Sequence, residues 1–246
     1  MASEPNVRYT PTATIPRVPD RKSSGAAAKR VLDTTAPPRR RQEILRVATA
    51  LFAERGYHAT SMQDIGDALG VQRGSLYHHI QSKEDLLFEI LSSCSATLLE
   101  AAEPIVASPI PAAEKFTRFI EAHLDTLISL RPEFRILIRE LKSLPPARRE
   151  KIIKYRDRYE YLVRRIIAEG VAAGEYRRVD AKYAGFVVLG ACNWVSSWYS
   201  PRGSLSRAEI AREFADLLLG GIAAARAASS RRRRSRAALP AAGGTV

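Results

Sequence analysis

This sequence has few cysteines and lacks the residue patterns of known catalytic sites, and each of these features argues against a class of protein. Only two cysteines occur among 246 residues. Cys94 and Cys192 lack the close spacing of metal ligands, and both lie in apolar helical segments. We therefore expect buried, reduced thiols and a cytoplasmic location. The sequence also has no nucleophile–base pair, carboxylate pair, glycine-rich phosphate loop or metal-ligand cluster, so it predicts neither an enzyme nor a cofactor or metal site.

Long apolar runs are also few. The N-terminal segment is polar and proline-rich and lacks the apolar core of a signal peptide. Residues 184–201 form an uncharged stretch of 18 residues, which is the length of a membrane span. However, Asn193, Ser197 and Ser200 form a polar stripe along it, which favours a helix buried by protein on both sides. We therefore expect no membrane association.

The charge of the chain is concentrated at its two ends. The net charge is +13 in total; residues 1–41 hold nine basic and three acidic residues, and residues 227–246 hold five arginines and no acid. Only +2 is left for residues 42–226. Residues 1–38 and 227–246 are predicted to be disordered basic tails. Such tails attract phosphates without regard to sequence.

The apolar periodicity between the tails is helical throughout. Hydrophobic residues make up 46% of the chain, recur at three- and four-residue spacing, and do not alternate as in a strand. The expected fold is all-α, with about nine helices. The first helix ends at Gly56, and the others are expected over residues 61–69, 73–79, 83–106, 112–130, 132–141, 146–170 or 174, 180–199 and 206–226.

The segment over residues 60–87 is the most informative part of the chain. Ser61 with Asp64 three residues later predicts a capping box at the start of a short helix, and Gly70 ends that helix. A second short helix is expected over residues 73–79, followed by a long one. Two short helices around a tight turn form a helix-turn-helix, whose second helix enters the DNA major groove. An αα-hairpin inside a helical bundle is the plain alternative.

The composition of the second short helix favours DNA. Leu76 is its main apolar residue, and Gly74 disfavours a helix by about 1 kcal/mol relative to alanine. A glycine is useful there if the backbone must approach another molecule closely. Gln72 has the groups to pair with adenine and Arg73 with guanine, and Ser75 is a further candidate contact. All of these residues are at or near the N-terminal end of the helix, the part that faces base edges.

Residues 39–87 resemble the DNA-binding domain of the TetR family of bacterial transcriptional regulators. The matching residues are Ile44, Ala48, Leu51, Phe52, Gly56, Thr60, Ile65, Gly70, Val71, Gly74, Leu76, Tyr77, His79, Ser82, Lys83, Glu84 and Leu87. Two positions depart from the family pattern, since Ile80 stands where Phe is usual and Gly66 where Ala is frequent.

This resemblance implies roles for further residues around the reading helix. Thr60, Tyr77 and Lys83 match positions that usually contact phosphates. We interpret His78 and His79 as packing or phosphate-side residues rather than metal ligands, because adjacent side chains on a helix point about 100° apart, which is poor for chelation. The expected DNA-binding domain covers residues 39–87.

The resemblance also implies that residues 88–226 form a larger helical domain for ligand binding and dimerisation. The last two predicted helices are the expected dimer interface, because the first is apolar nearly all round and the second would expose a broad apolar stripe in a monomer. That stripe consists of Ile210, Phe214, Leu217, Leu218, Gly221 and Ile222. A twofold dimer presents two reading helices to a near-palindromic operator.

A ligand cavity is expected among the aromatic and aliphatic residues of this domain. The candidates are Phe116, Phe119, Ile120, Leu124, Phe134, Ile138, Tyr155, Tyr159, Leu162, Trp194 and Trp198, although core packing is the better explanation for any one of them taken alone. The predicted helix over residues 148–165 carries two cationic clusters with tyrosines between them. That helix is either a solvated face or the docking site of an anionic ligand head.

A second resemblance covers residues 193–222, which are similar to the C-terminal end of TetR-type repressors of mycobacterial and rhodococcal sterol-ring degradation. The matching pieces are Trp194-Val195-Ser196, Trp198-Tyr199, Pro201, Gly203, Leu205 and Leu219-Gly220-Gly221-Ile222. Those regulators respond to acyl-CoA thioesters of steroid fragments.

The sequence therefore predicts a dimeric, ligand-responsive repressor that binds an operator in double-stranded DNA and is released by a small apolar or acyl-CoA-type effector. Two alternatives stay open. One is an architectural DNA-binding protein that acts through its basic tails. The other is an enzyme on a helical scaffold.

Overall fold

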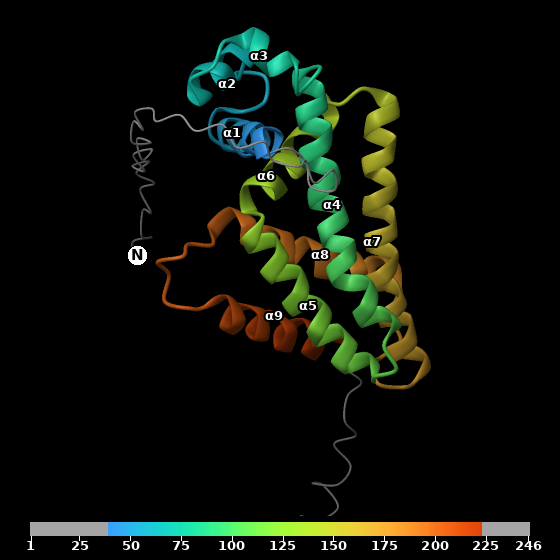
Figure 1. Ribbon diagram of the computed structural model, residues 1–246. Helices are drawn as coiled ribbons and strands as arrows, with labels where there is room; N and C mark the ends of the chain where they lie inside the picture. Colours follow the sequence, from blue (N-terminus) through green and yellow to red (C-terminus); the bar gives the residue numbers. More distant parts are fainter. Residues whose placement is uncertain (1–38, 223–246) are drawn as a thin grey trace, which may run out of the picture. The chain divides into compact units, whose positions relative to one another are not determined.

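The computed structural model describes residues 39–222, so both predicted tails lie outside the described residues. Nine α-helices, one short 3-10 helix and no strand make up the described part of the chain, which confirms the all-α prediction (Figure 1). The helices are α1 Arg39–Arg55, α2 Met62–Leu69, α3 Arg73–Tyr77, α4 Lys83–Ala107, α5 Ala112–Ser129, α6 Arg131–Glu140, η1 Leu141–Ser143, α7 Pro146–Ala172, α8 Ala181–Trp198 and α9 Arg207–Ile222.

Local capping contacts define where several of these helices begin and end. The amide of Asp64 donates to Ser61 Oγ at 3.1 Å and the amide of Ser61 donates to Asp64 Oδ2 at 2.7 Å, so α2 has its predicted capping box. Gly70 ends α2 in a left-handed conformation with φ of 66°, which glycine adopts without a steric cost. Helix α3 is shorter than predicted, since it ends at Tyr77 rather than at residue 79, and Ile80 then turns into the core with 2% of its surface exposed.

Two hydrophobic cores share the long helix α4. The first lies among α1–α3, where Ile44, Phe52 and Leu76 pack with the first turns of α4. The second joins the rest of α4 to α5, α7, α8 and α9. The predicted domain boundary between residues 87 and 88 therefore falls inside a continuous helix that belongs to both cores.

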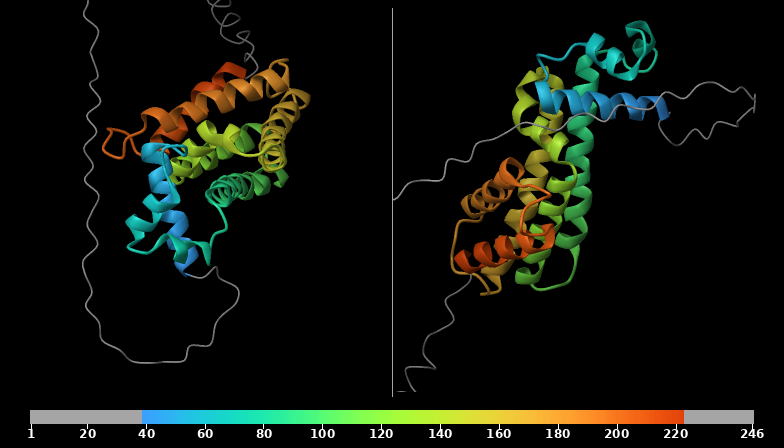
Figure 2. Two further views of the ribbon diagram at one scale, coloured as in Figure 1. Left: turned by 90° about the horizontal axis from the view of Figure 1, so that it is seen from above. Right: turned by 90° about the vertical axis from the view of Figure 1, so that its left-hand side faces the viewer.

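The short helix α6 contacts elements of both cores. It packs against α1 on one side and against α4 and α8 on the other. Ile136 is buried in the first core, whereas Phe134 is buried in the second. The right-hand view of Figure 2 shows α6 beside α1 and above α8. A displacement of α6 would therefore act on both cores.

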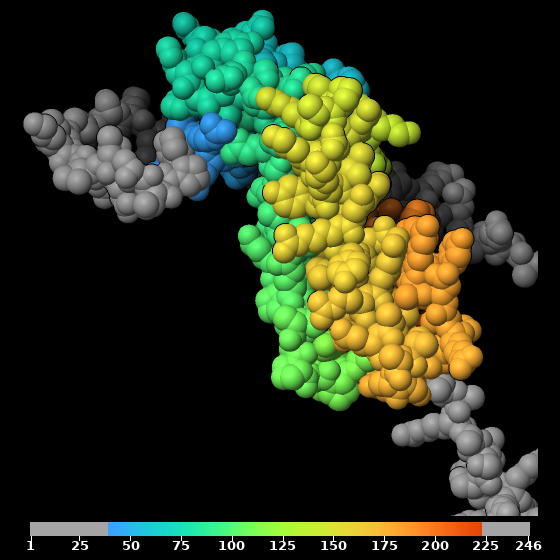
Figure 3. Space-filling view, turned by 90° about the vertical axis from the view of Figure 1, so that its right-hand side faces the viewer, coloured from blue at the N-terminus to red at the C-terminus, as the bar shows by residue number. Residues whose placement is uncertain are grey.

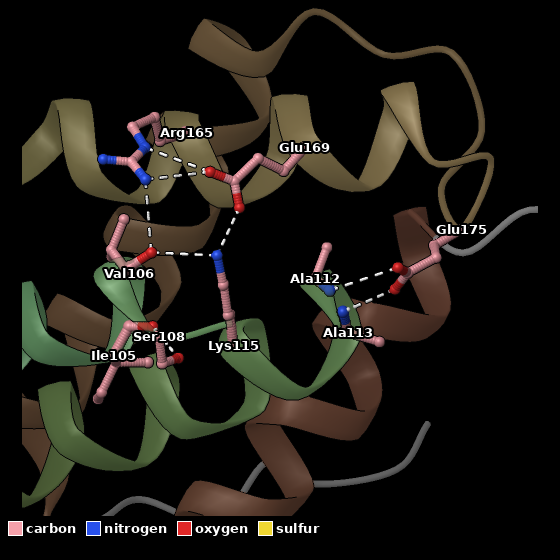
Figure 4. A network of polar contacts seen from close by, with 9 residues as sticks. All are labelled: Ile105, Val106, Ser108, Ala112, Ala113, Lys115, Arg165, Glu169 and Glu175. Carbon is pink, nitrogen blue, oxygen red and sulfur yellow. Dashed lines mark hydrogen bonds and ion pairs between the residues drawn. The ribbon is translucent and has the colours of Figure 1, made fainter. Parts of the chain in front are cut away.

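A polar network closes the end of the larger core that is remote from α1–α3 (Figure 4). The ammonium of Lys115 is 2.8 Å from Glu169 Oε2 and donates to the Val106 carbonyl at 3.1 Å. Glu175 accepts hydrogen bonds from the amides of Ala112 and Ala113, the first residues of α5. The network joins the end of α4, the start of α5 and α7, and it gives the buried Lys115 both a counter-charge and a carbonyl acceptor.

The expectations about apolar helices are partly corrected. Among the described residues, α4 is the one helix whose length and composition would suit a membrane span, and its apolar residues are largely buried in the two cores. Helix α8 was expected to be buried on both sides, but Tyr183, Val187 and Trp194 on one face are each 65% exposed. Cys94 and Cys192 are both free and buried, as predicted, and burial raises the pKa of each thiol to about 12.

Candidate DNA-reading helix and ligand cavity

Helix α3 presents nearly all of its polar side chains to solvent. Leu76 anchors it in the first core with 1% of its surface exposed. The exposed residues are Gln72, Arg73, Gly74, Ser75, Tyr77 and His78. Arg73 donates to the Tyr77 hydroxyl from Nε at 3.3 Å and from Nη2 at 3.0 Å. These two hydrogen bonds hold the guanidinium along the exposed face. To bind an acceptor on another molecule, the guanidinium would have to give up only its contact with one neutral hydroxyl.

Gly74 lies in the middle of this exposed face. A Cβ atom added there would meet nothing within 4 Å, and its φ lies outside the positive range in which glycine is favoured. No contact within the described chain therefore requires glycine at this position. The absence of a side chain is useful only toward a molecule outside the chain.

The structure buries Thr60, one of the residues that the resemblance implies as phosphate contacts. Its side chain is buried, with 1% of the residue's surface exposed, and its hydroxyl donates to the Gly56 carbonyl at 2.9 Å. Thr60 therefore stabilises the turn between α1 and α2. Its backbone is engaged as well, because the Thr60 amide donates to the Tyr57 carbonyl at 3.3 Å and the Thr60 carbonyl accepts from Lys83.

Lys83 is also engaged inside the protein. Its ammonium donates to the carbonyls of Tyr57 at 3.0 Å and Thr60 at 2.8 Å, and it lies 4.3 Å from the centroid of the Tyr57 ring. Since an ammonium has three donors, one N–H is left for a phosphate. Lys83 therefore joins the start of α4 to the turn before α2, and the phosphate contact stays a prediction.

The larger core contains a cavity of about 190 Å³ between α4, α5, α6, α7 and α8. Four of the predicted ligand residues line it, namely Phe134, Ile138, Tyr155 and Tyr159. The other lining residues are Ser95, Leu98, His123, Leu137, Leu141, Ile152, Arg156, Leu189 and Asn193. Most of these side chains are apolar, which suits an apolar ligand.

The remaining predicted ligand residues lie elsewhere. Phe119 and Leu162 are buried in the core but do not line the cavity; Phe119 packs on Tyr159 with ring centroids 5.4 Å apart. Trp194 and Trp198 are 65% and 47% exposed and lie outside the cavity. The interpretation of the tryptophans as cavity residues is therefore corrected, because α8 turns Leu189 and Asn193 toward the cavity instead. Phe116, Ile120 and Leu124 are core residues as well.

A hydrogen-bonded chain of three polar residues forms part of the cavity wall, and sequence reasoning predicted only Tyr159 among them and missed His123 and Asn193. His123 Nδ1 is 2.8 Å from the Tyr159 hydroxyl, and His123 Nε2 is 3.2 Å from Asn193 Oδ1. Burial lowers the pKa of His123 to about 4 and raises the pKa of Tyr159. The imidazole is therefore neutral near pH 7. The available signal was a lone histidine four residues after Phe119 on an otherwise apolar stripe of α5.

The mouth of the cavity lies beside a cationic surface. Ile138 is 60% exposed and Tyr155 is 36% exposed, and the exposed Arg156 also borders the cavity. Tyr155 in addition lines a neighbouring depression between α4 and α7, together with Phe88, Ser92, Lys151, Lys154 and Arg158. Figure 3 shows this side of the molecule, with α7 between α4 and α8. The cationic stretch predicted from the sequence thus adjoins the cavity.

A second exposed surface is apolar and lies on α8 and α9. Tyr183, Val187 and Trp194 extend along α8, and Leu217 of α9 is 73% exposed. Trp198 stacks on Phe214 at a centroid distance of 6.4 Å, which joins the two helices.

Among the described residues there is no group of three or more His, Cys, Asp or Glu side chains that would hold a metal ion.

Models of two protein domains match the chain. Residues 44–90 match the N-terminal model described as bacterial regulatory proteins of the tetR family, and residues 109–222 match the model described as tetracyclin repressor-like, C-terminal domain. The first match covers most of α1, then α2, α3 and the start of α4, and the second covers α5 to α9.

Individual relatives cover most of the chain. The HTH-type transcriptional repressor KstR2 of Mycolicibacterium smegmatis is 32% identical over 191 residues, which are 76% of this chain and 92% of that protein. The solved structure of the ketosteroid transcriptional regulator KstR2 of Mycobacterium tuberculosis has a TM-score of 0.71 and 28% identity, and it covers 75% of this chain and 95% of that one. The structure of AibR in complex with isovaleryl coenzyme A and operator DNA has a TM-score of 0.67 and 29% identity, with 73% of this chain and 98% of that one covered.

Proposed function

Since this chain belongs to the TetR family of bacterial regulatory proteins, we propose that it represses transcription as a ligand-responsive dimer. It binds a near-palindromic operator through α3 and leaves the DNA when an apolar or acyl-CoA-type effector occupies the cavity. The observation that carries the proposal is the joint presence of an exposed polar reading helix and an apolar cavity, linked by α4 and α6. As a regulator of transcription, the protein would act in the cytoplasm.

Sequence reading is assigned to the first turn of α3. Gln72 and Arg73 pair with adenine and guanine in the major groove, and Ser75 adds a contact. Tyr77, His78 and Lys83 face the phosphates on either side. Gly74 lets the backbone of α3 approach the DNA, which accounts for a glycine that no contact within the described chain requires.

The dimer is assigned to the apolar surface of α8 and α9. In a single chain this surface leaves Trp194 65% exposed and Leu217 73% exposed, and contiguous apolar patches of this kind mark association surfaces. A twofold pairing of α8 and α9 would cover them and set the distance between the two copies of α3.

The effector is assigned two parts, an apolar body and an anionic carrier. The cavity of about 190 Å³ is smaller than the usual range for a whole drug-sized ligand, roughly 300–1,000 Å³, so it suits the body alone. A carrier that leaves past Tyr155 and Arg156 would meet Lys151, Lys154 and Arg158. An acyl-CoA thioester has both parts, and AibR is a structural relative whose complex contains isovaleryl coenzyme A.

Coupling between the cavity and the reading helix is assigned to α6 and α7. Phe134, Leu137 and Ile138 of α6 border the cavity, while Ile136 is buried in the first core. Arg148 at the start of α7 pairs with Glu84 at 3.1 Å and also with Asp85, both in the first turn of α4. An effector that displaces α6 or α7 would therefore move α4 and change the distance between the two reading helices.

The test is an operator gel-shift experiment with the purified protein and a panel of fatty, aromatic and steroid CoA thioesters. We expect micromolar thioester to release the DNA, whereas free CoA and the free acid do not. An effector that binds the DNA-free form 100-fold more tightly weakens operator binding by about 2.7 kcal/mol. Failure of the whole panel would contradict the effector class, and failure to find a discrete operator would contradict the repressor.

A repressor and an architectural DNA-binding protein should respond differently when the charged ends of the chain are removed. Removing residues 1–35 and 227–246 takes away much of the net charge of the chain. A repressor that reads through α3 loses nonspecific affinity and keeps its operator preference. Footprinting would show one protected palindrome for a repressor and diffuse protection for an architectural protein.

A further inference from the structure

We propose that Asn193 selects effectors whose buried apolar body carries a hydrogen-bond acceptor, such as a carbonyl oxygen. The inference rests on the proposed function, because it assigns chemistry to the part of the effector that enters the cavity. It follows from the direction of the hydrogen bonds in the chain Tyr159–His123–Asn193.

The direction of these bonds is set by the amide oxygen. Asn193 Oδ1 only accepts, so the neighbouring His123 Nε2, at 3.2 Å, carries the proton. A neutral imidazole has one donor and one acceptor nitrogen. His123 Nδ1 is therefore the acceptor, and the Tyr159 hydroxyl donates to it at 2.8 Å. The lowered pKa of His123 and the raised pKa of Tyr159 keep both groups neutral and in these roles near pH 7.

This arrangement leaves the amide nitrogen of Asn193 unused. His123 holds the oxygen, and Asn193 Nδ2 makes no hydrogen bond with any residue in the range 39–222. The hydroxyl of Ser95, which also lines the cavity, already donates to the Leu91 carbonyl at 2.8 Å. Asn193 therefore brings N–H donors to a wall that is otherwise formed largely by apolar side chains such as Leu98 and Leu189.

The position of the network sets where the acceptor must lie on the effector. His123 and Tyr159 are 2% and 8% exposed and Asn193 is partly buried, whereas Ile138 and Tyr155 are 60% and 36% exposed. The polar network therefore belongs to the inner part of the cavity and the carrier leaves on the side of Ile138 and Tyr155. A matching effector has its acceptor on the apolar body, away from the carrier.

An effector with a purely hydrocarbon body would remove water from the Asn193 N–H groups without replacing the hydrogen bond. A buried donor left unpaired is costly, and this cost makes polar groups effective in discriminating between ligands. We expect about tenfold discrimination in affinity, as is typical of one neutral hydrogen bond.

The test uses two small probes of nearly equal shape, acetophenone and α-methylstyrene, which differ by a carbonyl oxygen in place of a methylene group. Each is titrated calorimetrically into the full-length, DNA-free protein, and the ratio of the two dissociation constants is measured. The same ratio is measured for Asn193→Leu, which keeps the branched shape of the side chain but has no N–H group, and for Ser95→Ala as the matched control. Comparing ratios cancels the different solubilities of the probes and any uniform loss of stability.

We expect the preference for acetophenone to fall about tenfold in Asn193→Leu and to stay unchanged in Ser95→Ala. The carbonyl stretching band of bound acetophenone should lie at lower frequency in the wild type than in Asn193→Leu. An unchanged ratio in Asn193→Leu, an equal fall in Ser95→Ala, or no binding of acetophenone to the wild type would each overturn the proposal. Operator binding by the same proteins is measured separately, so failure of the repressor assignment would be recognised by loss of a discrete gel shift.

Discussion

The reading surface and the cavity are built in opposite ways. Every side chain assigned to base reading lies within residues 72–75, on one short helix held by the buried Leu76. The cavity instead takes its walls from five helices, and its polar chain joins His123 to Asn193 across 70 residues. A surface made by one helix can be recognised from local sequence, whereas a cavity exists only after distant helices have packed.

The two regions also differ in how they tolerate change. Exposed residues of α3 contribute little to folding, so their substitution should change DNA binding and leave stability nearly unchanged. Cavity and core residues are buried among several helices, so their substitution should change stability and ligand response together. The predictions below test this difference, from the largest expected effect to the smallest.

The largest effect is expected at the apolar surface of α8 and α9. Leu217→Arg places a charge on a side chain that is 73% exposed in the single chain, so the fold should be retained. The proposed dimer would have to bury that charge without a partner, and we expect monomers and at least about a 100-fold loss of operator affinity. Light scattering coupled to size-exclusion chromatography measures the mass. Tyr161→Arg, at a 58% exposed position of α7, is the control that should stay dimeric.

The next effect concerns the stability of the larger core. Lys115→Ala removes the buried ammonium that pairs with Glu169 at 2.8 Å. Because the Glu169 side chain is 37% exposed and partly solvated, we expect a loss of about 2–3 kcal/mol, below the usual cost of breaking a fully buried pair. Chemical denaturation measures it, with Lys154→Ala, in an exposed ion pair with Glu150, as a control near zero.

The same pair predicts a dependence on pH. The hydrogen bond from Lys115 is the largest favourable cause of the lowered pKa of Glu169. A carboxyl group with a lowered pKa in the folded state stabilises the protein above its ordinary pKa of about 4.3 and loses that contribution as the pH falls below this value. The stability difference between wild type and Lys115→Ala should therefore shrink in acid. A difference that stays constant from pH 7 to pH 3 would rule out this linkage.

A smaller effect is expected for DNA recognition. Arg73→Ala should weaken operator binding by about 1–3 kcal/mol per half-site and relax base preference at one position. The thermal midpoint should change little, because Arg73 is exposed and bonds only to Tyr77 among the described residues. Binding of every sequence with wild-type affinity would show that α3 is not the reading helix.

Lys83→Ala is the informative comparison, because it also removes one positive charge. It should lower the salt dependence of binding by about one unit per subunit for all DNA sequences. Unlike Arg73→Ala, it should also destabilise the protein, since Lys83 donates to the carbonyls of Tyr57 and Thr60. Titrating operator and nonspecific DNA at several salt concentrations distinguishes the two variants.

The smallest effect is expected at Gly74. Gly74→Ala should stabilise α3 by up to about 1 kcal/mol, because alanine favours the helix and the added methyl group meets no atom within 4 Å. Operator affinity should nevertheless fall, if the backbone at this position lies against DNA. Higher stability together with unchanged DNA affinity would contradict the close approach.

The sequence by itself determined the features that depend on neighbouring residues. The capping box of α2, the left-handed Gly70, the helix-turn-helix order and the all-α fold follow from residue types at spacings of three to four. The exposed face of α3 follows in the same way, since Leu76 is its one buried residue. Such features do not depend on contacts with residues that are distant in the sequence.

Only the tertiary structure decided which apolar residues surround the cavity. An apolar stripe shows that a helix is covered but not by which neighbour. From the sequence, Trp194 and Trp198 were therefore predicted to line the cavity, but in the structure they lie on an exposed face. His123 and Asn193, which come from different helices, instead meet in the cavity wall. Likewise, the cationic character of Lys83 was evident from the sequence, but its bonds to Tyr57 and Thr60 depend on packing the start of α4 against the turn before α2.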